Sequence, residues 1–87
     1  MDAITEIPKL AKEDKLFIGK DLTLKNLKTG KVKKVFLSSN CPVETIEDIK
    51  HYAELAKVDT EILDIPNDEI GVLCKKLFSI SVLGLRS

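Results

Sequence analysis

The sequence predicts an α/β fold in which helices cover both faces of a four-stranded sheet. Three observations predict it. Helix-like and strand-like segments alternate along the chain, and the strand-like segments are short and apolar, as in a sheet buried on both faces. The chain has 87 residues, 44% of them apolar and 32% charged, which suffices for one hydrophobic core but not for two. We therefore expect a single globular domain over residues 1–87.

The first third of the chain predicts two helices on either side of a short strand. Apolar residues at helical spacing predict the first helix, namely Ile4, Ile7, Leu10 and Ala11. Pro8 must either start this helix or bend it. Leu16–Ile18 is a brief apolar run closed by Gly19, which predicts a strand and a turn. A second helix is expected from about Asp21 to Thr29, with Gly30 at its C-terminal cap.

A buried strand and a long helix are predicted next. Val35–Ser39 is short, apolar and β-branched at its start, which is typical of a central strand. Pro42 suits the first position of a helix, because proline lacks only an amide hydrogen that is unpaired there anyway. Glu44 and Glu47 place negative charge near the positive end of the helix dipole, which favours a helix start there. An apolar stripe marks the inward side of this helix, namely Ile46, Ile49, Ala53 and Ala56.

The last quarter of the chain predicts a strand, a short helix and a final strand. Thr60–Ile65 is expected to be the third strand. Asn67 is expected to be the N-cap of a helix over about Asp68–Lys75, since asparagine is favoured at that position. Phe78–Leu85 predicts the last strand. Periodicity alone does not determine the order of these strands in the sheet.

The net charge is zero, but the charges are unevenly distributed along the chain. Residues 15–34 contain seven lysines and one acid, a net charge of +6, whereas residues 35–73 contain nine acids and two lysines, a net charge of −7. The basic segment borders a glycine turn at the expected start of a helix, where unpaired amides also attract anions. Phosphate binding by this segment is therefore one hypothesis, and an ordinary solvated surface is its alternative.

The sequence shows none of the patterns that an enzyme of this size requires. Its one histidine, His51, is predicted on the polar side of its helix, which favours a solvated side chain. The four glycines are too widely spaced for a dinucleotide-binding or phosphate-binding loop. The acids of the long helix are expected to lie along one solvated face, namely Glu44, Glu47, Asp48 and Glu54. We expect no catalysis, no cofactor and no small-molecule substrate.

The two cysteines, Cys41 and Cys74, have no neighbouring cysteine or histidine at a metal-ligand spacing. We expect both to be small buried hydrophobic residues, and we expect no metal site. The apolar stretches are only a few residues long, well short of the roughly 20 residues that a membrane-spanning helix needs. We therefore expect a cytoplasmic protein without membrane contact.

The segment GKDLTLKNLKTGKVKKVFLSSNCP, residues 19–42, resembles the kink-turn-binding ribosomal protein superfamily. The likeness consists of a glycine before the helix, a threonine four residues later, a glycine closing the helix, a lysine before the strand, and the Ser-Asn-x-Pro exit of Ser39–Pro42. It continues through Glu47–Lys57, Glu69–Gly71 and Ser79–Leu83 and so covers about residues 15–85. The closest likeness is to the thirty-e type of archaeal and eukaryotic large subunits, with the seven-Ae type as a wider relative. The fold implied is a three-layer α/β/α sandwich with a central four-stranded mixed sheet.

The resemblance implies a ribosome-associated structural constituent of the large subunit, which binds a kinked internal loop or neighbouring helix of ribosomal RNA. Its expected partners are this RNA and neighbouring ribosomal proteins. The implied RNA contacts are Gly19, Lys20, Asp21, Leu22, Lys25, Lys28, Asn40, Ile65, Ile70, Gly71 and Ser79. Lys31, Lys33 and Lys34 are expected to supply supplementary phosphate contacts. In such a site amides and Asn40 bond to base edges, and Ile65 or Ile70 packs on an exposed base.

Three alternatives stay open at this point. Asn40 either reads RNA or caps the helix that follows it. Gly71 either lets the RNA backbone come close or lets its helix pack on the sheet. Finally, Asp21 and the acidic helix favour a protein-interaction module of the same fold with weak or no intrinsic RNA binding, whereas the lysine segment favours RNA.

Overall fold

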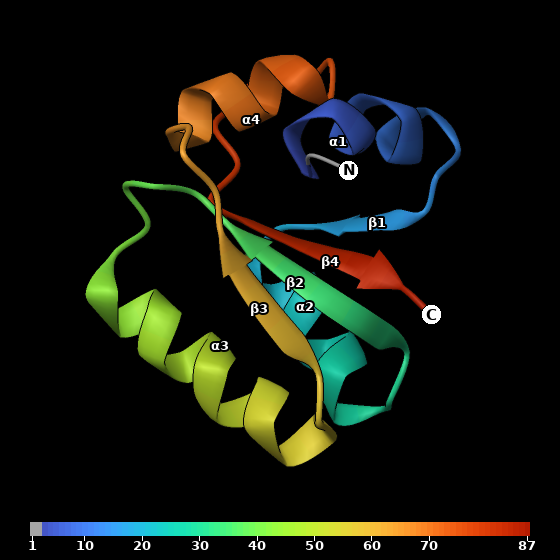
Figure 1. The fold of residues 1–87 in the computed structure, drawn as a ribbon, viewed down its shortest axis with the longest axis vertical. Helices are drawn as coiled ribbons and strands as arrows, with labels where there is room; N and C mark the ends of the chain where they lie inside the picture. The colour runs from blue at the N-terminus through green and yellow to red at the C-terminus, as the bar shows by residue number, and fades with distance from the viewer. Residues whose placement is uncertain (1–2) are drawn as a thin grey trace.

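A computed structural model describes residues 3–87, and Figure 1 shows how their helices and strands are arranged. The first two residues of the predicted domain lie outside this range. The elements in chain order are α1 (Ala3–Lys12), β1 (Leu16–Ile18), α2 (Lys20–Lys28), β2 (Val32–Leu37), α3 (Val43–Ala56), β3 (Asp59–Ile62), α4 (Asn67–Leu73) and β4 (Val82–Arg86). The predicted alternation of helices and strands is confirmed.

The four strands form one mixed sheet in the order β1-β4-β2-β3. β2 and β3 are parallel, whereas β4 runs antiparallel to both of its neighbours, β1 and β2. Consequently β1, β2 and β3 all point toward one end of the sheet, and β4 begins there. The central strands β2 and β4 each contain three consecutive buried residues, whereas the edge strand β3 contains none, as expected for strands covered on both faces. The predicted mixed sheet is confirmed.

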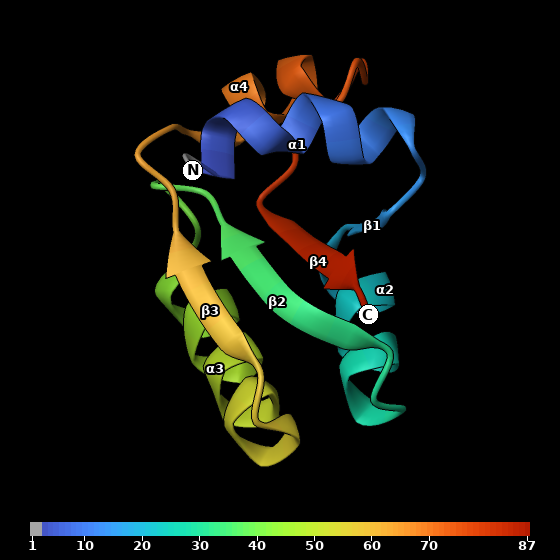
Figure 2. The ribbon, with the colours of Figure 1, turned by 45° about the vertical axis from the view of Figure 1, so that its right-hand side comes forward.

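Helices cover both faces of the sheet, with α1 and α4 on one face and α2 and α3 on the other (Figures 1 and 2). Successive side chains of a strand point to opposite faces, so β2 contributes to two cores. Phe36 packs in a cluster with Ile7 of α1 and Ile70 of α4. Its neighbour Leu37 packs in a cluster with Ile49 of α3. The three-layer sandwich that the sequence predicted is confirmed.

The strand boundaries differ from the prediction. β2 begins at Val32 and not at Val35, because three lysines nearby made its first residues look like a loop. The predicted strand over Phe78–Leu85 begins only at Val82. The segment before Val82 is attached to α4 instead, since the Ile80 amide donates to the Asn67 carbonyl oxygen at 3.0 Å. β3 is also shorter than predicted and ends at Ile62.

The helix starts differ by one residue from the prediction. Pro42 precedes α3 as its N-cap and is not its first residue. Asn67 is the first residue of α4, and the N-cap residue is Pro66, which makes no side-chain hydrogen bond to the helix. The prediction that Asn67 caps α4 is therefore wrong, because its side chain is used elsewhere. Pro8 lies inside α1 and does not start it.

Cys41 and Cys74 are both buried and free, as predicted. Burial raises the pKa of both thiols, and this effect exceeds the opposing influence of Lys20 on Cys41 and of Lys76 on Cys74. His51 is exposed, which confirms the prediction of a solvated side chain. None of the helices in residues 3–87 is long and apolar enough to cross a membrane. Within the same range no cluster of three His, Cys, Asp or Glu side chains has an arrangement suited to a metal ion.

Candidate nucleic-acid interface

Four connections of the chain meet at the end of the sheet toward which β1, β2 and β3 point, and we call this the loop end. Its connections are residues 19–20, 38–42, 63–66 and 77–81. Backbone hydrogen bonds join them, from the amides of Gly19 to Val82 (2.9 Å), Ser38 to Ser81 (2.9 Å) and Ser39 to Ile65 (2.8 Å). Segments far apart in sequence are thus held side by side here, at the top of the sheet in Figure 1.

The turn between β1 and α2 depends on Gly19. Its φ is +103°, a backbone conformation that residues with a side chain rarely adopt. The turn leads directly into α2, whose first amides have no acceptor within the helix itself. Asp21 is exposed on this first turn, and Leu22 is 45% exposed. The predicted glycine turn before a helix is confirmed, and the helix begins one residue earlier than predicted, at Lys20.

A network of side-chain hydrogen bonds links two of these connections to the start of α4. The Asn40 Oδ1 accepts a hydrogen bond from the Asn67 amide at 2.9 Å, and the Asn40 Nδ2 donates to the Asn67 Oδ1 at 3.2 Å. The Asn67 Nδ2 in turn donates to the Ser81 Oγ at 3.3 Å. Asn40 therefore does not cap α3; it bonds to the first amide of α4 instead. The side chain stays exposed at the surface of the loop end.

A groove of about 490 Å³ opens between the β1–α2 turn, the start of α3 and the loop that leads into β4. Gly19, Lys20 and Ser79 line it, as the sequence prediction of a shared site requires. Lys76 and Phe78 also line it, and neither is among the individual contacts that the resemblance implied. Phe78 is 58% exposed. An aromatic residue flanked by lysines and serines was the available signal, but its position at the start of an alternating pattern made it look like part of a strand.

The predicted contacts Ile65, Ile70 and Gly71 are buried or half-buried beneath the surface of the loop end. Ile70 is 0% exposed and packs in the core, so the prediction that its side chain packs on an exposed base is wrong. Ile65 is half-buried against the same core. Gly71 is buried, and a Cβ there would overlap the carbonyl oxygen of Phe78. This close approach favours a packing role for Gly71, although the glycine lets α4 pack on the loop beside the groove and not on the sheet.

The charges around the groove are mixed. The Lys20 Nζ lies 3.1 Å from the Asp48 Oδ2 of α3, so this cation is already paired within the protein. The helices α2, α3 and α4 all begin at the loop end, and each has an acidic residue in its first turn, namely Asp21, Glu44, and Asp68 with Glu69. Carboxylates stabilise helix N-termini, but they also reduce the attraction of this end for phosphate.

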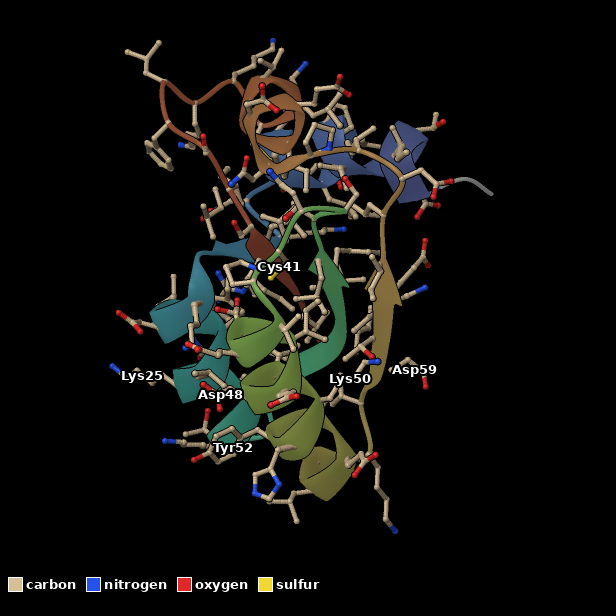
Figure 3. The ribbon with its side chains drawn as sticks, turned by 90° about the vertical axis from the view of Figure 1, so that its left-hand side faces the viewer. Lys25, Cys41, Asp48, Lys50, Tyr52 and Asp59 are labelled. Atoms are coloured by element: carbon tan, nitrogen blue, oxygen red, sulfur yellow. The ribbon has the colours of Figure 1, made fainter. Side chains whose placement is uncertain are left out.

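The remaining lysines of the basic segment lie away from the groove. Lys25 and Lys28 are in the last turn of α2, and the Lys28 Nζ sits 4.8 Å from the centre of the Tyr52 ring. Figure 3 shows Lys25 pointing away from the body of the protein, well below Cys41 at the loop end. Lys31, Lys33 and Lys34 lie at the opposite end of the sheet, where β2 starts. The run of lysines that is continuous in sequence therefore does not form one surface.

Comparisons with known proteins agree with this fold. The model of the family described as Ribosomal protein L7Ae/L30e/S12e/Gadd45 matches residues 1–86. The large ribosomal subunit protein eL30 of Archaeoglobus fulgidus is 40% identical over 70 residues, which cover 78% of this chain and 74% of that protein. The eL30 protein of Candida albicans is 34% identical over 74 residues, which cover 85% and 70%.

Among solved structures, a 15.5 kD RNA binding protein of Giardia lamblia is similar, with a TM-score of 0.85. The match covers 97% of this chain and 70% of that chain at 17% sequence identity. Identity at this level shows a shared fold, and it supports the three-layer arrangement described above.

Proposed function

This chain belongs to the ribosomal protein L7Ae/L30e/S12e/Gadd45 family, and we propose that it is a structural constituent of the large ribosomal subunit that binds a kinked internal loop of ribosomal RNA. The similarity to two eL30 proteins supports the assignment to the large subunit and a ribosome-associated, cytoplasmic location. The partners are then ribosomal RNA and neighbouring ribosomal proteins. Its role in the particle is structural and not catalytic.

The observation that carries the proposal is the exposed ring of Phe78 beside a groove lined with backbone and small polar groups. Kinked internal loops display unstacked bases, and proteins recognise such bases by stacking on aromatic rings and by hydrogen bonds to their edges. Phe78 is 58% exposed, so its ring is available for stacking. A base extruded from the RNA covers it by stacking, which contributes about 1–3 kcal/mol per base.

Other groups in the groove, and Asn40 elsewhere at the loop end, provide the complementary contacts. The first amides of α2, presented by the Gly19 turn, are hydrogen-bond donors for phosphate or base oxygens. Two hydrogen bonds to Asn67 hold the Asn40 side chain in place. The further hydrogen bonds that its amide can make therefore point in a fixed direction. Lys20 and Lys76 line the groove and are positioned for phosphates. Phosphate contacts orient the RNA, and the aromatic and amide contacts select the unstacked base.

The experiment that tests the proposal compares two RNAs with the full chain. One RNA contains a kinked internal loop of the large subunit, and the other has the same helices fully paired. Phe78→Ala is expected to lower the affinity for the kinked RNA about 5- to 150-fold, the equivalent of 1–3 kcal/mol. The control variant is Leu55→Ala, which removes a side chain 71% exposed on α3, and it should leave this affinity unchanged. Equal affinity of the native chain for both RNAs would refute recognition of a kinked loop.

A protein-interaction module is the second candidate, and the acidic first turns at the loop end favour it. Asp21→Lys discriminates between the two functions. If RNA phosphate lies against this turn, the variant binds kinked RNA more tightly, although it loses about 0.3–1 kcal/mol of helix stabilisation in the free protein. The matched control is Glu54→Lys, an identical charge change on an exposed position of α3. A gain no larger than that of the control would support the protein-interaction function.

A further inference from the structure

The end of the sheet opposite the groove carries a cluster of cations from three adjacent strands. Val32 at the start of β2 pairs with Arg86 at the end of β4. The Arg86 amide donates to the Lys15 carbonyl oxygen at 2.9 Å, next to β1. Adjacent strands lie about 4.8 Å apart, so the backbones at these positions are close neighbours. We call this cluster the basic end, and its members are Lys15, Lys31, Lys33, Lys34 and Arg86.

Several of these cations are free to meet a ligand. Lys31 and Lys33 are exposed, and neither forms an ion pair within residues 3–87. The Arg86 guanidinium lies 5.0 Å from the Phe17 ring centre, which orients it without neutralising it. Lys15 and Lys34 are paired with Glu13 at 3.4 Å and Glu61 at 2.9 Å, but both pairs are exposed and weak.

The backbone at the start of β2 adds to the exposure of the lysines. The register between β2 and β4 shifts between Val32 and Lys34, so Lys33 occupies an irregularity of the ladder. Such bulges redirect side chains at the edge of a sheet. Lys33, Lys15 and Arg86 line one hollow of about 720 Å³, whose other lining includes the acids Glu6, Glu13 and Asp14. The cations sit together at the strand ends, and the three acids come from α1 and the turn after it.

The kind of partner follows from what surrounds the cluster. Protein interfaces have an apolar centre, usually with aromatic residues. The large hydrophobic residues exposed within residues 3–87 all lie outside the basic end, namely Leu22, Val43, Leu55, Ile62, Val72, Leu77 and Phe78. The two leucines that line the hollow, Leu10 and Leu85, are not among these exposed residues, so the exposed part of the basic end is lysine and arginine and matches a polyanion backbone better than a folded protein surface.

We propose that the basic end is a second RNA-binding surface, which holds the phosphate backbone of an RNA helix separate from the RNA in the groove. The two sites differ in what they recognise. The groove has the aromatic and amide groups that select an unstacked base, whereas the basic end has the positive charge and selects no sequence. A chain with both sites joins two RNA segments, and this joining role rests on the function proposed for the groove.

The test uses the full chain and a perfectly paired RNA duplex without an internal loop. Each phosphate neutralised contributes about 0.9 to the slope of log affinity against log salt for a double helix. Lys31→Gln combined with Lys33→Gln is expected to lower this slope by about 1.8 and the affinity at 0.1 M salt by about tenfold or more. The charge-matched control combines Lys12→Gln and Lys50→Gln, two exposed lysines of α1 and α3, and should change neither quantity.

The outcomes separate the two sites. An unchanged slope in the Lys31 and Lys33 variant, or an equal loss in the control, overturns the proposal for the basic end. Phe78→Ala must leave duplex binding intact, since a loss would mean that the duplex occupies the groove. If the native chain binds kinked RNA but no duplex, only the proposal for the basic end is contradicted. If it binds duplex but does not distinguish kinked RNA, only the proposal for the groove is contradicted.

Discussion

Replacing Gly71 by alanine gives the sharpest test of how the groove is built. Alanine is normally preferred to glycine inside a helix by about 1 kcal/mol, so propensity alone predicts a gain in stability. The new methyl group would overlap the Phe78 carbonyl oxygen and lie only 3.2 Å from the Phe78 carbonyl carbon and 3.6 Å from the Ser79 Cα. These are backbone atoms, so no side-chain rotation relieves the overlap, and either α4 or the loop must move.

Overpacking of this kind costs about 1–3 kcal/mol, and we expect a net loss of about 2 kcal/mol. For a domain of this size that loss lowers the melting temperature by about 8–16 °C, measured by thermal unfolding in the absence of RNA. Gly84→Ala is the comparison, because its methyl group would meet the Thr23 side chain at 3.0 Å, and a side chain can adjust. A Gly71→Ala protein as stable as the native chain, but unable to bind RNA, would refute the packing role and assign the glycine to RNA approach.

Three further predictions concern the charged and amide groups. Asp48→Asn releases Lys20 from its exposed ion pair, so we expect two- to fivefold tighter binding of kinked RNA, about 0.4–1 kcal/mol, in a titration at constant salt. Asn40→Ala removes two hydrogen bonds to Asn67, so thermal unfolding should show a loss of about 1 kcal/mol, and kinked RNA should lose more affinity than duplex. Lys25 belongs neither to the groove nor to the basic end, so Lys25→Ala should leave the slope of log affinity against log salt unchanged, like the control Lys50→Ala; a slope flattened by about 0.7–0.9 in Lys25→Ala alone would show RNA contact on that face of α2.

Much of the fold could be predicted because local and global signals agree. Gly19 and Gly30 bracket α2 in the sequence, and both have a positive φ in the structure, which is the conformation that glycine permits. The apolar stripe also predicted the buried side of α3 correctly, since Ile49 and Ala53 are at most 1% exposed. In these segments the same residues satisfy the propensity of the helix, the turn chemistry and the core at once.

The candidate site was harder to predict, because sequence neighbours are not spatial neighbours there. A helix rises about 1.5 Å per residue, so the nine residues of α2 carry the chain about 12 Å from Lys20 to Lys28, and Lys31 lies beyond the end of the helix. One run of lysines was therefore divided between two ends of the protein. Phe78 was assigned to a strand because its alternating neighbours mimic one, whereas the backbone of Ile80 is bonded to α4. Whether this segment forms hydrogen bonds with the sheet or with α4 is decided by tertiary structure, and it leaves no periodic signal in the sequence.

The side-chain network at the loop end depends on correct strand registration. Asn40 and Asn67 are 27 positions apart, and Asn67 and Ser81 are 14 apart, so no local segment contains the whole network. Its residues lie in the connections and at the start of α4, whose positions are set by the strands that they join. A slip of one residue between neighbouring strands would reverse the direction of every side chain on the slipped strand and displace these connections. The network therefore forms only in chains whose strands have paired in the native register. If RNA binds at the loop end as proposed, it selects correctly folded copies of the protein for assembly.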